Sequence, residues 1–208
     1  DYSATGIPPH SRVCIIGGTG AGKTQVLAHY IRLSPNLFSR IIIFNKEDEA
    51  IYDMLNKGLN NKIEFHHNLS ELETLKDLRK DMEDGENILL VLDDFMFEIG
   101  SNKFKNLNDY FIRGRKKNIS LFLLSQNFYT IPKPLRNNCN FMIFCKINST
   151  KDVGLIMSEY DNKNKDLRQI YKKIMEKPLQ FMKLQTTVCS DFEKVSLNFT
   201  DYIEFKQD

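Results

Sequence analysis

The chain has 208 residues, and its 29 basic and 27 acidic side chains leave a formal net charge of +2. This balance excludes a uniformly basic surface, so any contact with nucleic acid must come from a local patch. The length fits one domain, and a hydrophobic fraction of 41% is ordinary for a globular protein. We expect neither a membrane-spanning helix nor a secretory signal peptide, because no apolar run approaches about 18 residues.

The four cysteines are scattered along the chain, with no C-x-x-C pair: they are Cys14, Cys139, Cys145 and Cys189. This spacing favours buried, reduced thiols over zinc ligands or disulfides, and it indicates a reducing, intracellular setting. The sequence begins at Asp1 rather than Met, which is consistent with a processed or trimmed piece.

The first predicted strand, residues 13–16, runs directly into a glycine-rich segment that reads GGTGAGKT. This is G-x-x-x-x-G-K-[ST] between a strand and a helix, the phosphate-binding loop of nucleoside triphosphatases. Its amides can surround phosphate oxygens, Lys23 can reach the β- and γ-phosphates, and the Thr24 hydroxyl can ligate Mg²⁺. The predicted nucleotide-binding residues are Gly17, Gly18, Thr19, Gly20, Ala21, Gly22, Lys23, Thr24 and Gln25.

Strands and helices then alternate. The first helix covers residues 23–33 and stops at Ser34-Pro35, a strand follows at 41–44, a helix at 49–57 and a short extra strand at 63–66. The segment 70–73 reads as a capping box, which predicts a helix with Leu72, Leu75 and Leu78 on one stripe.

The most apolar run, residues 88–92, ends in Asp93-Asp94. Asp93 is predicted to hold Mg²⁺ together with Thr24, and Asp94 to polarise the attacking water. Asp is one methylene shorter than the Glu found in many related hydrolases, so another acid such as Glu47 is an alternative helper. Taken alone, the acidic pair could also begin a solvated loop.

A helix at 104–112 is followed by a cluster of four cations, the segment Arg113-Gly114-Arg115-Lys116-Lys117. Three interpretations stay open: a solvated charge run, a contact with DNA phosphates, or an arginine finger given to a neighbouring subunit. The next strand starts at the edge of the sheet opposite the phosphate loop, which favours donation in trans, with Arg115 ahead of Arg113.

That next strand, residues 119–124, leads into Ser125-Gln126. Gln126 would face the γ-phosphate and bind the lytic water or a γ-oxygen. The mixed aromatic, proline and basic segment after it, up to Arg136, suggests a loop that senses nucleotide and touches a partner or DNA. For Arg136, capping a structural carboxylate is the alternative.

A strand at 141–145 precedes a change of pattern. Helices are predicted from the Ser149-Thr150-Lys151-Asp152 start and over 163–175, and a hairpin over 179–185 and 195–199. The basic run on the second of these helices reads as a solvated face, and His66-His67 as surface. The sequence therefore predicts an α/β fold, with a mainly parallel sheet covered by helices on both faces. Residues 1–150 would form the core, and 151–208 a C-terminal appendage of helices and a hairpin.

Taken together, these motifs resemble the FtsK–HerA superfamily of DNA-pumping ATPases, and within it the genome-packaging ATPases of large cytoplasmic DNA viruses and virophages. The discriminating stretch is Gly114-Arg115-x-x-Asn118-Ile119-Ser120, running into Leu124-Ser125-Gln126. The position after Arg115 departs from the group, because it is Lys116 where His is frequent. Residues 151–208 carry no motif that matches.

The resemblance implies a RecA-like P-loop NTPase core of the ASCE class, with ATP and Mg²⁺ as cofactors. It implies a homo-oligomeric ring of five or six subunits that moves double-stranded DNA into a preformed capsid at a portal vertex. The expected location is the viral factory in the host cytoplasm, and the virion. Lys23, Asp94, Gln126 and Arg115 or Arg113 would form the catalytic set. Two alternatives remain, a small-molecule kinase and a nucleotide-gated assembly factor.

Overall fold

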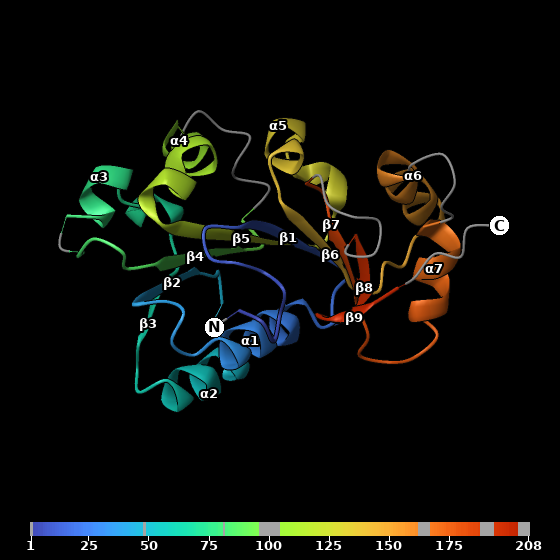
Figure 1. The fold of residues 1–208 in the computed structure, drawn as a ribbon, viewed down its shortest axis with the longest axis horizontal. Helices are drawn as coiled ribbons and strands as arrows, with labels where there is room; N and C mark the ends of the chain where they lie inside the picture. The colour runs from blue at the N-terminus through green and yellow to red at the C-terminus, as the bar shows by residue number, and fades with distance from the viewer. Residues whose placement is uncertain are drawn as a thin grey trace.

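A computed structural model describes residues 2–47, 49–80, 82–95, 105–161, 167–187 and 194–203. Within these residues one nine-stranded sheet crosses the molecule in the order β3-β2-β4-β5-β1-β6-β7-β8-β9 (Figure 1). The strands are β1 Arg12–Ile16, β2 Arg40–Phe44, β3 Ile63–His66, β4 Ile88–Asp93, β5 Ile119–Ser125, β6 Phe141–Phe144, β7 Met182–Gln185, β8 Val195–Leu197 and β9 Asp201–Tyr202.

Seven α-helices are described, together with three short 3₁₀ turns. The helices are α1 Lys23–Leu33, α2 Ala50–Gly58, α3 Leu75–Leu78, α4 Lys105–Arg113, α5 Lys133–Asn137, α6 Thr150–Tyr160 and α7 Leu167–Ile174. The 3₁₀ turns are η1 Leu69–Glu71, η3 Gly114–Lys117 and η4 Phe128–Thr130. The start of the helix predicted at 104–112 and the segment 163–166 of the helix predicted at 163–175 lie outside the described residues.

The sheet is buried on both faces because helices cover each of them. In β1, Val13 and Ile15 pack toward α1 and α2, while Cys14 and Ile16 pack into the core beneath α4, α6 and α7. Figure 1 shows α1 and α2 on one side of the sheet and α3 to α6 on the other. Two cores explain why the central strands read as continuous apolar runs rather than as alternating patterns.

The first six strands in this order are parallel, as predicted, and the last three are antiparallel. The predicted C-terminal hairpin forms from β7 and β8 and continues the central sheet by pairing β7 with β6. Because the parallel strands point one way, the loops after β1, β4 and β5 all emerge at the same edge.

The predicted capping box at residues 70–73 is wrong. Asn68, rather than Ser70, caps the turn η1 by accepting a hydrogen bond from the Ser70 backbone N–H at 2.9 Å. The helix α3 starts later, where the Thr74 hydroxyl accepts from the Asp77 N–H at 3.3 Å. Asn and Thr are both good N-caps. Each begins a separate helical turn here, and Leu72 between the two turns is buried in the core.

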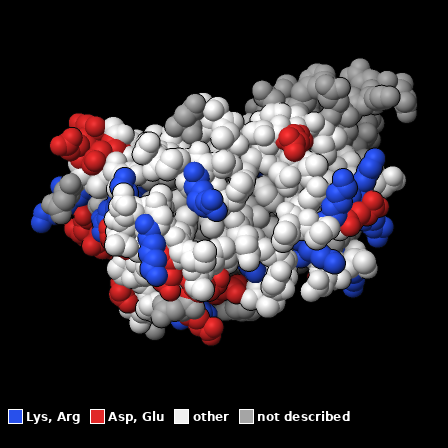
Figure 2. All heavy atoms as spheres, turned by 90° about the horizontal axis from the view of Figure 1, so that it is seen from below, with Lys and Arg blue, Asp and Glu red and all other residues white. Residues whose placement is uncertain are grey.

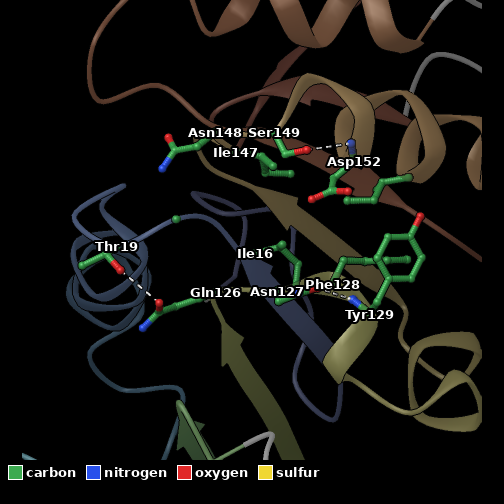
Figure 3. A pocket seen from close by; sticks show the side chains of 12 residues that line it. Ile16, Thr19, Gln126, Asn127, Phe128, Tyr129, Ile147, Asn148, Ser149 and Asp152 are labelled. Atoms are coloured by element: carbon green, nitrogen blue, oxygen red, sulfur yellow. Dashed lines mark hydrogen bonds between the residues drawn. The ribbon is translucent and has the colours of Figure 1, made fainter.

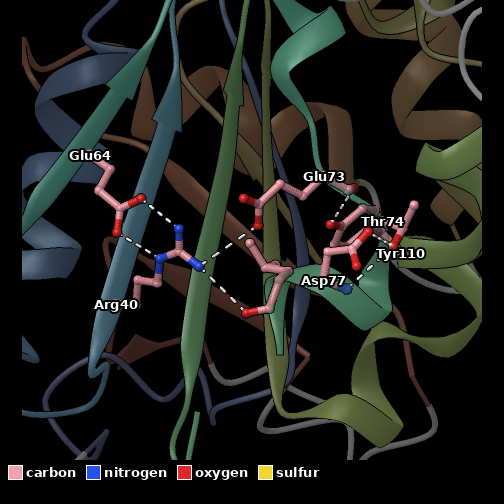
Figure 4. A network of polar contacts seen from close by, with 7 residues as sticks. Arg40, Glu64, Glu73, Thr74, Asp77 and Tyr110 are labelled. Atoms are coloured by element: carbon pink, nitrogen blue, oxygen red, sulfur yellow. Dashed lines mark hydrogen bonds and ion pairs between the residues drawn. The ribbon is translucent and has the colours of Figure 1, made fainter. Parts of the chain in front are cut away.

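Arg40 ties the edge strand β3 to the rest of the sheet. Its Nε and Nη2 donate to the two carboxylate oxygens of Glu64 at 2.6 and 2.7 Å, and its Nη1 donates to the Leu78 carbonyl at 3.4 Å (Figure 4). Beside this pair, the Tyr110 hydroxyl donates to the Glu73 carbonyl at 2.9 Å. Such a two-pronged guanidinium–carboxylate pair fixes both position and orientation.

Lys183 joins the N-terminal segment to β7. It is 1% exposed, its ammonium donates to the Thr5 carbonyl at 3.1 Å, and it lies 5.3 Å from the centre of the Tyr202 ring. Burial lowers the pKa of Lys183 to about 8. The two ends of the described chain are therefore held together by a desolvated cation.

The face covered by α1 and α2 carries charges of both signs. Figure 2 shows Lys and Arg interspersed with Asp and Glu, with wide uncharged areas between them. No described helix is long and apolar enough to cross a membrane. Cys14, Cys139 and Cys145 are buried free thiols, as predicted, and Cys189 lies outside the described residues.

Candidate nucleotide site

The predicted phosphate loop connects β1 to α1 at the carboxyl edge of the sheet. The Gly17 N–H donates to the Ser125 carbonyl at 3.2 Å, and the Gly18 N–H to the Lys146 carbonyl at 2.9 Å. The loop is therefore held between the ends of β5 and β6, with the amino terminus of α1 directly behind it. A helix amino terminus presents free N–H groups and a partial positive charge, which suit a phosphate.

Geometry explains why two positions of the loop are glycine. Gly22 caps α1 with φ +91°, a left-handed conformation that side-chain-bearing residues rarely adopt. At Gly17 an added Cβ would lie 2.7 Å from the Cβ of Cys145, so any larger residue would push the loop off the sheet. The glycine at position 17 is thus required by packing against Cys145.

Lys23 folds back over the loop. Its ammonium donates to the Gly18 carbonyl at 3.4 Å, and the residue is only 8% exposed. The positive charge is thereby held inside the loop, among backbone groups that can also contact phosphate.

Asp93 ends β4 as predicted, and it is buried at 6% exposure. Tyr52 on α2 donates its hydroxyl to Asp93 Oδ2 at 2.6 Å, and the Thr24 side chain lies beside the same hydroxyl. Burial raises the pKa of Asp93 to about 6, and the negative charges of Glu49 and Asp94 act in the same direction. The Tyr52 hydrogen bond and the charge of Lys23 lower that pKa and oppose the shift.

Asp94 turns away from the strand with φ +59°, a left-handed conformation that Asp tolerates better than most residues. Its carboxylate accepts a short hydrogen bond from Gln126 Nε2, and the Thr19 hydroxyl donates to Gln126 Oε1 at 2.9 Å. Gln126 therefore joins the phosphate loop to the acidic pair, across the adjacent ends of β1, β5 and β4. The structure brings these predicted site residues together.

A cavity of about 250 Å³ lies beside the phosphate loop (Figure 3). Thr19 and Gln126 form one side, and Asn148, Ser149 and Asp152, from the start of α6, form the other. Phe128 and Tyr129 from η4 also line it. The cavity is mixed in polarity, and it opens next to the residues predicted to face the γ-phosphate.

Arg113 and Arg115 are not part of this constellation. They lie at the end of α4 and in η3, before β5 begins, so they are at the amino edge of the sheet. Both are exposed, and Arg113 pairs only loosely with Asp109, at 3.8 Å. As predicted, the two arginines lie at the edge of the sheet opposite the phosphate loop. They are too far from the loop to act in the site of their own subunit.

Arg136 on α5 is buried against aromatic rings. Its guanidinium lies 4.1 Å from the centre of the Phe128 ring and 5.4 Å from that of Tyr129. Its Nε and Nη1 have no hydrogen-bond partner within the described part of the chain. The contact is therefore a cation–π stack, which links the segment after Gln126 to α5.

Two residues of the site were missed by sequence reasoning, Tyr52 and Glu49. Both lie at the start of α2, with no motif around them, and the Tyr52 N–H bonds the Glu49 carbonyl at 2.9 Å. Only the packing of α2 across the end of the sheet brings them to Asp93, so no local pattern in the sequence could have identified them. Glu47, the acid considered as an alternative helper, uses its carbonyl to accept a hydrogen bond from the Asn45 side chain.

Solved structures with this fold include viral packaging enzymes. The DNA-packaging ATPase B204 from Sulfolobus turreted icosahedral virus superposes with a TM-score of 0.63 at 15% identity, covering 92% of this chain and 98% of that one. The genome packaging NTPase B204 from Sulfolobus turreted icosahedral virus 2, in complex with AMPPCP, gives 0.65 at 12% identity over the same shares. The pCW3 conjugation coupling protein TcpA gives 0.63 at 12% identity, covering 94% of this chain and 61% of that one.

At these identities the superpositions establish the RecA-like P-loop fold. A sequence comparison with curated proteins found no match. A family model, described as Poxvirus A32 protein, matches residues 9–207, nearly the whole chain. The resemblance inferred from the motifs is confirmed, and the chain belongs to the Poxvirus A32 protein family.

Proposed function

We propose that this chain is the ATP-hydrolysing motor that packages a double-stranded viral DNA genome into a preformed capsid. The observation that carries the proposal is the Thr19–Gln126–Asp94 chain of hydrogen bonds. It supports the proposal because Asp94, which would activate water, and Gln126, which would respond to the γ-phosphate, lie beside the phosphate loop. Membership of the Poxvirus A32 protein family and the fold shared with packaging ATPases support the same function.

In this mechanism the loop amides and Lys23 hold the β- and γ-phosphates of ATP. Asp94 accepts a proton from the attacking water, which Gln126 orients toward the γ-phosphorus. The hydrogen bond that Gln126 makes to Asp94 would break or shift when a γ-phosphate arrives, since the amide would turn toward it. Gln126 would thereby report nucleotide state to the segment that follows it.

Thr24 and Asp93 fit a Mg²⁺ site. Both are oxygen ligands of the kind that Mg²⁺ prefers. Asp93 accepts a hydrogen bond from Tyr52, and Thr24 lies beside the same hydroxyl, which supports a shared site. When bound, Mg²⁺ would neutralise charge on the β- and γ-phosphate oxygens. Burial raises the pKa of the Asp93 carboxyl, and a bound cation would favour the carboxylate and lower that pKa again.

We infer that the arginines act in trans within a homo-oligomeric ring, of five or six subunits by the resemblance to packaging motors. Their exposed position at the amino edge of the sheet supports this. Arg115, or Arg113, of one subunit would complete the active site of its neighbour and stabilise the transferring phosphoryl group. Double-stranded DNA in the pore, capsid or portal components, and a location in the viral factory and virion belong to the same proposal.

Release of phosphate in the presence and absence of double-stranded DNA tests the function. DNA should stimulate ATP hydrolysis, and the double variant Arg113→Ala/Arg115→Ala should abolish this turnover while leaving ATP binding intact. Insensitivity of turnover to both DNA and the double variant would contradict a ring motor. Transfer of the γ-phosphate to a nucleoside instead of water would indicate a kinase.

A further inference from the structure

Tyr52 lies between the two residues assigned to the magnesium site. Its hydroxyl donates to Asp93 Oδ2 at 2.6 Å, and the Thr24 side chain lies beside the same hydroxyl. Tyr52 is 1% exposed, so water does not compete for this hydroxyl. One phenol thus contacts the phosphate loop and the acidic strand end at the same time.

The position of Tyr52 is set by core packing rather than by the site itself. Its ring belongs to the hydrophobic cluster beneath α1 and α2, and its centre lies 5.9 Å from that of Phe65 on β3. Leu55, one turn further along α2, is buried in the same cluster. Since these apolar contacts do not depend on a ligand, the hydroxyl is held in place before nucleotide arrives.

The hydrogen bond to Asp93 has a direct geometric effect. A carboxylate on a short side chain can rotate about its last bond, and a donor fixed on Oδ2 removes that freedom. The other oxygen, Oδ1, would then be the one available to a cation or its bound water. Groups that orient metal ligands in this way are the usual outer partners of metal sites in proteins.

We propose that Tyr52 is a positioning residue for the magnesium site, orienting the Asp93 carboxylate beside Thr24 for a Mg²⁺–nucleotide complex. This inference rests on the proposed function, because it assumes the Mg²⁺ site formed by those two residues. Tyr52 does not touch the reacting atoms, so its effect appears in the Mg²⁺ requirement before it appears in the chemical step.

The test compares Tyr52→Phe with Tyr110→Phe. Tyr110 is equally buried and donates its hydroxyl to the Glu73 carbonyl at 2.9 Å, but it lies in the layer of α4, outside the site. Each variant loses one buried hydroxyl, so a general loss of stability should affect both. Calorimetry gives the ADP affinity first in EDTA and then across a series of Mg²⁺ concentrations.

We expect Tyr52→Phe to need about 10-fold more Mg²⁺ than the wild type for half of the gain in ADP affinity, within the range for outer partners of metal sites. Its affinity for ADP in EDTA should equal that of the wild type. Tyr110→Phe should match the wild type in both measurements. At saturating Mg²⁺ the kcat of Tyr52→Phe should return toward the wild-type value.

An unchanged Mg²⁺ requirement in Tyr52→Phe would overturn the inference, as would an equal loss of ADP affinity in EDTA. A double-mutant cycle with Asp93→Asn guards against an indirect effect: once Asp93 is changed, Tyr52→Phe should add no further loss, and full additivity would also overturn it. A wild-type protein whose ADP affinity ignores Mg²⁺ would instead contradict the magnesium site of the proposed function.

Discussion

Arg115 and Gln126 lie beyond opposite ends of the same strand, β5, which is seven residues long. At about 3.3 Å per residue the strand alone separates them by about 20 Å, which is farther than an arginine side chain can reach. The two residues therefore serve different active sites if both contact a γ-phosphate.

The first prediction concerns subunits that complement each other. Lys23→Ala and Arg115→Ala should each be inactive alone, because one loses phosphate binding and the other loses the donated arginine. In mixed rings, about a quarter of the interfaces would combine an intact loop with an intact arginine. ATP turnover should therefore reappear on mixing.

The control is the same mixture made with Arg113→Ala, which identifies the arginine that acts. Light scattering must show that mixed rings have formed. Donation in trans would be contradicted if mixed rings form but remain inactive in both mixtures, with Arg115→Ala and with Arg113→Ala.

The second prediction separates turnover from binding. Asp94→Asn should lower kcat by about 100-fold or more, since it removes the proposed base, while the Kd for ATP changes little. Asp53→Asn, an exposed carboxylate on α2, is the matched control and should behave like the wild type. If Glu49→Gln lowers kcat as strongly as Asp94→Asn and Asp94→Asn stays active, the base is Glu49.

The third prediction follows from the pKa of Asp93, which burial raises to about 6. An acid whose folded-state pKa lies above its ordinary value binds its proton more tightly when folded. Asp93 therefore makes the unfolding free energy fall as the pH rises from about 4 to 6. At pH 7.5, without nucleotide or Mg²⁺, Asp93→Asn should be more stable by about 2–3 kcal/mol.

Thermal unfolding at pH 7.5 and pH 5 measures this effect. The advantage of Asp93→Asn should shrink at pH 5, where most of the wild-type carboxyl is already protonated. An Asp93→Asn protein that is less stable than the wild type at both pH values would show that the carboxylate is well compensated in the native state.

The fourth prediction uses Lys183, whose pKa burial lowers to about 8. Here the unfolded chain binds the proton more tightly, so the unfolding free energy of the wild type should rise between about pH 8 and 9.5, by at most about 1.4 kcal/mol per pH unit. Lys183→Met should lack this rise. Lys57→Met, at an exposed position, should keep it.

Much of the fold could be predicted because its signals are local. The apolar runs of β2, β4 and β5 reflect burial on both faces, and the phosphate loop fixes the direction of β1 and α1. The helix start at Thr74 could not be predicted, since Ser70 and Thr74 are both capable caps and only the packing of the intervening leucine decides between them.

The proximity of the candidate site residues could be predicted where the order of the strands alone determines it. Asp93, Asp94 and Gln126 follow strands that the fold must place side by side. Tyr52 was missed because its partner Asp93 is 41 residues away, and their contact depends on how α2 crosses the sheet end. The continuation of the sheet by β7 was missed for the same reason, since antiparallel pairing with β6 is a long-range choice.

All seven residues of β5 are buried, and the strand pairs with β4 over residues 119–124 and with β1 over residues 121–125. A strand bound in this way does not stretch or bend at modest cost. If an arginine is donated in trans, the spacing between a subunit's own ATP site and that arginine would stay constant throughout the cycle. The angle between whole subunits can still change. Nucleotide hydrolysis in a ring would therefore rotate the subunits as rigid bodies, and the size of that rotation would determine the length of each DNA step.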